Sequence, residues 1–167
     1  IFLIDLWLDV IKEIPNAVLV FAGNGELEES LKLDVRRLGL KDNIIFLGSI
    51  NNVPELLSIT DIGVFVSSYE GFGLVLIENF AMKIPVVATD IESFKDIAIQ
   101  NENAFLISLK DRKEYIKMII ELCKNSALRD RIAGNAYIEA QKYSVDTMIE
   151  SYAHYYAKLV QKNSTNG

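Results

Sequence analysis

The sequence contains few of the residues on which several classes of protein depend. Its single cysteine, Cys123, cannot form an internal disulfide, which is typical of a protein that folds in a reducing compartment. The one histidine, His154, lies far along the chain, so we interpret Cys123 as a small apolar helix residue rather than a nucleophile. No His, Cys and Asp cluster has the spacing of metal ligands. These absences exclude a disulfide scaffold and argue against a metal centre.

Positive charge and long apolar runs are also scarce. The chain has 17 Lys and Arg against 23 Asp and Glu, and this net charge of −6 argues against a general nucleic-acid surface and a basic membrane patch. No apolar run reaches transmembrane length, and the first one is interrupted by Asp5. The start has neither an initiating Met nor the charged region of a signal peptide, so we expect a fragment.

What remains is the composition of a globular domain. Half of the 167 residues are hydrophobic and 24% are charged, which is enough for one domain with a real core. Short apolar runs alternate with helical patterns, and this predicts a doubly wound parallel sheet with helices on both faces. The predicted strands are 18–22, 43–47, 62–66, 85–88 and 104–107, and the predicted helices are 1–14, 26–38, 53–59, 74–82, 93–97, 111–123, 127–143 and 145–160. We expect one domain over residues 1–160 and a disordered tail over 161–167.

The segment 61–90 is the centre of this pattern. Two Val-rich runs flank a loop, Glu70-Gly71-Phe72-Gly73, and a helical stretch, which together predict a strand, a loop, a helix and a parallel strand. Ligands bind at the carboxyl ends of the strands in such sheets, and a helix amino terminus with nearby glycines suits phosphate. The loop is therefore a candidate binding site.

Two carboxylates in this segment stand out. Helix 74–82 is apolar around nearly its whole circumference, which predicts that it lies inside a larger body. Burying the Glu78 carboxylate within this helix would cost on the order of several kcal/mol, unless the side chain is paired, hydrogen-bonded or open to a wet cleft. Either Glu70 or Glu78 alone is compatible with a structural role. The pair, with glycines between, predicts one crevice that both side chains face.

The segment EGFGLVLIENFAMKIPVVATD, in which seven residues separate Glu70 from Glu78, resembles the signature of retaining group 1 glycosyltransferases of the GT-B fold. The resemblance extends over nearly the whole chain. It implies the Rossmann-like carboxyl-terminal half of such an enzyme, the half that binds a nucleotide-diphosphate sugar. Glu70 would then contact hydroxyls of the donor hexose, and Glu78 would contact the ribose hydroxyls.

The resemblance also implies a set of donor contacts. The turn after the first strand would line the cleft, the next strand exit would hold the base, and the amides opening helix 74–82 would meet the sugar and phosphates. Two serines lie at the carboxyl end of strand 62–66, a position from which their hydroxyls can donate to phosphate. These residues are Gly23, Asn24, Gly25, Leu47, Gly48, Ile50, Val53, Ser67, Ser68, Gly71, Phe72, Gly73 and Leu74. The alternatives are an ordinary turn, a strand exit and, at Phe72, a core aromatic.

Two departures from the family pattern matter. The family opens this half with a strand that ends in a basic residue, followed by a Lys-Gly or Lys-Asn turn that grips the diphosphate, and this chain starts just after that point. Because the missing strand is central, we expect a gap in the sheet through truncation, unless residues 1–4 substitute for it. Lys83 stands where the family commonly has Gly, and we expect it to close the helix rather than bind diphosphate.

The resemblance thus predicts transfer of a hexose, from a UDP-sugar in preference to GDP-mannose, with retention and without metal or other cofactor. The implied partners are the absent amino-terminal domain and a glycan or lipid-linked acceptor. The implied process is bacterial-type polysaccharide biosynthesis. The implied location is the cytoplasm, where the absent domain would bring the enzyme to the inner face of the membrane. No nucleic acid and no membrane contact from this fragment are expected. The alternatives are a noncatalytic nucleotide-binding module or a fragment of a nucleotide-sugar isomerase, which needs a catalytic acid and a His not found here. The fragment alone should be inactive.

Overall fold

The computed structural model describes residues 1–164, and residues 165–167 of the expected tail lie outside the described part. The last helix, α8, runs over Val145–Ser164. Residues 161–164, which the sequence analysis had assigned to the tail, therefore belong to this helix.

Five strands follow the predicted order, each within two residues of its expected limits. They are β1 (Leu19–Ala22), β2 (Ile44–Gly48), β3 (Gly63–Phe65), β4 (Val86–Thr89) and β5 (Phe105–Ile107). All described strand pairs are parallel, which confirms the predicted sheet type. The strands form two sheets, however, with the orders β1-β2 and β3-β4-β5.

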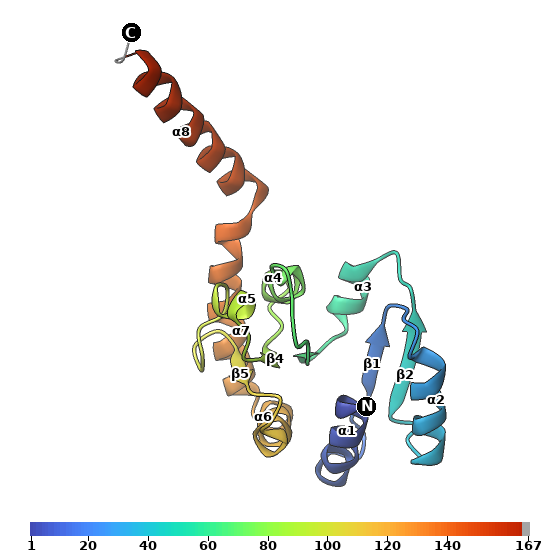
Figure 1. Ribbon diagram of the computed structural model, residues 1–167. Coiled ribbons are helices and arrows are strands. Elements are labelled where there is room, and N and C mark those ends of the chain that lie inside the picture. The colour runs from blue at the N-terminus through green and yellow to red at the C-terminus, as the bar shows by residue number, and fades with distance from the viewer. Residues whose placement is uncertain (165–167) are drawn as a thin grey trace.

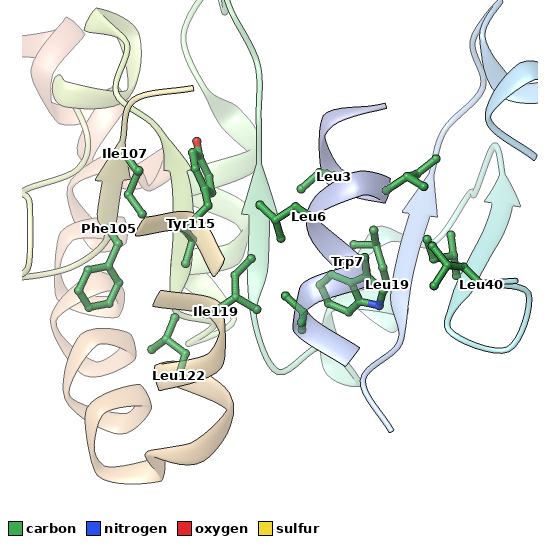
Figure 2. Packing of buried hydrophobic residues seen from close by; sticks show 14 of the residues in the cluster. Leu3, Leu6, Trp7, Leu19, Leu40, Phe105, Ile107, Tyr115, Ile119 and Leu122 are labelled. Carbon is green, nitrogen blue, oxygen red and sulfur yellow. The ribbon is translucent and has the colours of Figure 1, made fainter. Parts of the chain in front are cut away.

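The gap between these sheets lies at β1 and β3, neither of which pairs with a described strand on its second side. Residues 1–4 do not fill it, so that alternative is wrong. Their apolar side chains recur at helical spacing and belong to α1 (Phe2–Glu13), which buries Leu3, Ile4, Leu6, Trp7 and Val10. Figure 2 shows Leu3, Leu6 and Trp7 on this helix, between β1 and the rest of the core.

The remaining helices also match the sequence pattern. They are α2 (Glu28–Arg37), α3 (Val53–Ser58), α4 (Leu74–Ala81), α5 (Glu92–Lys95), α6 (Arg112–Lys124) and α7 (Ser126–Ala140). The predicted helix 127–143 ends as a 3-10 turn, η1 (Gln141–Tyr143). Asp111 caps α6, since its side chain accepts a hydrogen bond from the Glu114 amide at 3.1 Å.

Both faces of the three-stranded sheet are covered. Val87 of β4 packs with α1 and α6 on one face, whereas its neighbours Val86 and Ala88 pack with α4, α5 and α7 on the other. The two-stranded sheet is covered on one face only, because Val20 and Ile45 are exposed. Helices on both faces are thus confirmed for β3-β4-β5, and for β1-β2 the second face has no cover among the described residues.

Helix α8 extends away from the body of the molecule (Figure 1). Its large apolar side chains follow one helical stripe and are exposed: Val145, Met148, Ile149, Tyr152, Tyr155, Tyr156 and Leu159. Among the residues that the structure describes, no helix combines the length and apolar character needed to cross a membrane.

Candidate functional site

The loops that follow β1 and β2 meet each other. The Gly23 amide donates to the Gly48 carbonyl oxygen at 2.7 Å, and both glycines have positive φ, 115° and 65°. The Asn24 side chain lies against Gly48, since a Cβ there would be 3.1 Å from Asn24 Oδ1. The structure therefore joins two segments that the sequence analysis had singled out separately.

Most of this region is open to solvent. Asn24, Gly25 and Leu47 are exposed, and Ile50 and Val53 are half-buried. Val53 begins α3, which lies at the same end of the molecule as α4 (Figure 1). These loops form a rim at the carboxyl ends of two parallel strands, where α/β proteins bind their ligands.

A second group of predicted residues lies on the loop that follows β3. Ser67 Oγ donates to Glu70 Oε1 at 2.6 Å, and both side chains are half-buried. Ser68 and Gly71 beside them are exposed. The structure thus fixes one of the two predicted carboxylates by a short, charge-assisted hydrogen bond.

Helix α4 begins at Gly73, whose φ of 96° favours glycine. A Cβ there would come within 2.9 Å of the Phe94 ring, so the close contact also requires glycine. Gly73 at the N-cap has no side chain with which to cap the helix. A helix start of this kind suits an anionic ligand, the role that the resemblance implied for the amides of 71–74.

Glu78 lies on an exposed face of α4. It shares this face with Leu74, which is 62% exposed, and Met82, which is 39% exposed, and the helix buries Leu76, Asn79 and Phe80 instead. The expectation that the helix lies inside a larger body is wrong for the described residues, because they cover only one side of it. Glu78 carries no burial penalty, so burial supplies no argument for its function.

Phe72 and Lys83 also occupy informative positions. Phe72 is 50% exposed and meets Tyr143 edge-on, with ring centroids 5.9 Å apart, so its interpretation as a core aromatic is wrong. Lys83 has a φ of 56°, a conformation typical of glycine after a helix, and its Nζ lies 4.7 Å from the centre of the Tyr137 ring. Lys83 therefore closes α4 as predicted.

The loop after β3 is anchored by two hydroxyl groups that were not predicted from the sequence. Thr89 at the end of β4 is buried, and its hydroxyl donates to the Phe65 carbonyl oxygen at 3.3 Å. The Tyr115 hydroxyl from α6 donates in turn to Thr89 Oγ1 at 3.1 Å. Burial raises the pKa of Tyr115, which keeps this hydroxyl protonated. The one signal in the sequence for this anchor was Thr89, a polar residue at the end of a buried strand.

With this geometry established, comparison with known proteins identifies the family. The model of glycosyl transferases group 1 matches residues 3–139. The UDP-Gal:alpha-D-GlcNAc-diphosphoundecaprenol alpha-1,3-galactosyltransferase of Escherichia coli is 30% identical over 117 residues, which cover 69% of this chain and 30% of that enzyme. The chain spans less than half the length of the curated relatives it matches.

Solved structures agree with the sequence match. The C-terminal domain of a group 1 glycosyl transferase, LpcC, from Francisella tularensis superposes with a TM-score of 0.76 at 29% identity, covering 86% of this chain and 78% of that one. A variant of TarM from S. aureus in complex with UDP gives 0.84 at 26% identity, covering 92% of this chain and 31% of that one. The chain therefore belongs to the group 1 glycosyltransferase family and has the fold of the carboxyl-terminal domain of its GT-B members.

Proposed function

We propose that this chain is the donor-binding half of a glycosyltransferase that moves a hexose from a nucleotide-diphosphate sugar to an acceptor. The observation that carries the proposal is the Glu70 carboxylate, held by Ser67 at the end of β3, three residues before Gly73 opens α4. It presents a fixed acceptor for sugar hydroxyls beside helix amides that suit phosphate. A UDP-sugar is favoured because the E. coli relative is named for UDP-Gal and TarM was solved with UDP.

The proposed roles follow from the residue types. Glu70 accepts hydrogen bonds from hexose hydroxyls, and Glu78 on the exposed face of α4 accepts them from the ribose diol. The amides of residues 71–74 and the Ser68 hydroxyl meet the diphosphate and the sugar. The joined loops 23–25 and 47–50, with Val53, surround the base. Transfer proceeds with retention and without metal, and helix amides stabilise the leaving diphosphate.

The full-length protein that contains this chain tests the proposal directly. Supplied with UDP-hexoses and a glycan or lipid-linked acceptor, it should transfer the sugar, and Glu70→Ala or Glu78→Ala should lower kcat/KM by about 100-fold, as expected when a hydrogen-bonded carboxylate is lost. Glu150→Ala on α8 is the matched control, because this exposed acid lies outside the proposed site and should leave activity unchanged. Full activity in both site variants would overturn the proposal.

Product analysis separates the alternatives. A noncatalytic module would bind nucleotide without transfer, and an isomerase would change the sugar while it stays attached to the nucleotide. A transferase releases UDP and glycosylates the acceptor, and NMR of the new anomeric centre reports retention or inversion. Activity that persists in EDTA would support metal independence.

Calorimetry of this chain alone supplies a second test. We expect weak or no binding of UDP and GDP, because the family's basic diphosphate-gripping residues have no counterpart in this sequence. Binding near 1 μM, which corresponds to about −8 kcal/mol, would contradict that expectation.

A further inference from the structure

We propose that Ser67 is a positioning residue for Glu70 rather than a phosphate ligand, an inference that rests on the proposed function. Its hydroxyl donates to Glu70 Oε1 at 2.6 Å. A serine hydroxyl carries one proton, so while it is given to the carboxylate it is not available to a phosphate oxygen. Ser67 and Ser68 were both expected to donate to phosphate, and the geometry separates the two.

The bond orients the carboxylate for a sugar diol. With Oε1 held by Ser67, Glu70 Oε2 and the remaining lone pairs of Oε1 are left to accept hydrogen bonds from the ligand. A carboxylate that is already held loses less side-chain freedom when the sugar binds or reacts. Ser67 thus lowers the cost of forming the sugar contacts without touching the sugar.

The loop that carries both residues is fixed at each end. Two residues before Ser67, the Phe65 carbonyl accepts the hydrogen bond of the buried Thr89 hydroxyl. Three residues after Glu70, Gly73 packs too closely against Phe94 to admit a Cβ. The Ser67–Glu70 bond therefore spans a short loop with anchored ends, and this arrangement suits positioning.

The test compares the sugar step with nucleotide binding in the full-length protein. We expect Ser67→Ala to lower kcat for hexose transfer about tenfold, the effect of losing one hydrogen bond to a charged group, while the inhibition constant of UDP stays unchanged. Ser67→Thr, which keeps the hydroxyl, should restore most of the rate. Ser151→Ala is the matched control, since the Ser151 hydroxyl donates to the Thr147 carbonyl within α8, away from the proposed site. Circular dichroism and thermal unfolding establish that each variant folds.

A double-mutant cycle completes the experiment. If Ser67 acts through Glu70, adding Ser67→Ala to Glu70→Ala should change the rate no further. If the two substitutions lower the transfer rate independently, or if the UDP inhibition constant rises as kcat falls, Ser67 acts as a phosphate ligand and the proposal is overturned. If Ser67→Ala leaves the transfer rate unchanged while Glu70→Ala lowers it, the positioning role of Ser67 is refuted and the proposed function stands. A harmless Glu70→Ala would refute the proposed function itself.

Discussion

The backbone amide of Gly23 donates to the Gly48 carbonyl across 2.7 Å, and this bond ties the loop after β1 to the loop after β2. Both residues are glycines in a left-handed conformation, so the contact depends on backbone shapes that other residues adopt at a cost. The geometry of this rim can therefore be tested by adding a single methyl group.

Gly48→Ala should destabilise the chain by about 1 kcal/mol, because alanine is strained at a φ of 65° and its Cβ would crowd Asn24 Oδ1 at 3.1 Å. Urea unfolding followed by circular dichroism measures the change. Gly134→Ala is the matched control, since nothing lies within 4 Å of a Cβ at this position in α7, and it should stabilise by about 0.5–1 kcal/mol. Equal effects from the two substitutions would contradict the assigned backbone conformation.

Lys83 is also held with positive φ, and glycine should suit its position better than alanine. Lys83→Gly should be more stable than Lys83→Ala by about 1 kcal/mol, because both lose the amine over Tyr137 and only alanine keeps the backbone strain. The same two substitutions at exposed Lys117, in the middle of α6, should show the opposite order of stability by a similar amount. The same order at both positions would refute the left-handed assignment.

The buried Tyr115 hydroxyl predicts a pH dependence. Burial raises its pKa above the ordinary value of about 10, so its contribution is present below pH 10 and is lost as pH rises through the raised folded pKa. Tyr115→Phe should cost about 1 kcal/mol at pH 7 through loss of the bond to Thr89 and should show a shallower decline at alkaline pH. Unfolding at pH 7 and 10.5 measures both, and exposed Tyr152→Phe should behave like the wild type. A steeper decline in Tyr115→Phe would reverse the argument.

Removing α8 should cost the body little stability. Its apolar stripe is exposed, so a chain ending at Ser144 should unfold within about 1 kcal/mol of the intact chain and associate less with itself at high concentration. Urea unfolding and sedimentation velocity measure these two effects. Leu6→Ala, at a fully buried side chain, should cost about 2–5 kcal/mol in the same assay. A comparable loss on removing α8 would mean that the helix supports the core.

The sequence predicted the elements well because their signals are local. Short apolar runs placed each strand within two residues of its limits, and residue types with strong local preferences mark helix ends, as Asp111 before α6 and Gly39 after α2 do. The sugar-binding assignment came from the segment around Glu70 and Glu78, whose motif is specific to a family. Periodicity, caps and motifs all lie within a short window of sequence.

The rest depended on contacts between distant segments. The Thr89 hydroxyl links Phe65 and Tyr115, which come from different elements and are invisible to a local pattern. The exposed face of α4 could not be predicted, because an apolar helix does not reveal which neighbours cover it. The bond from Ser67 to Glu70 depends on the conformation of one loop, and sequence alone left each side chain with a separate role.

The flanks of β1 and β3 that pair with no described strand have a practical consequence. Each presents backbone donors and acceptors of a parallel sheet with no described strand to receive them. Such flanks can pair with strands from other polypeptides, so this chain in isolation should self-associate as its concentration rises. A short, Val-rich synthetic peptide that pairs beside β1 should slow this self-association in sedimentation velocity, whereas a proline-containing version should not.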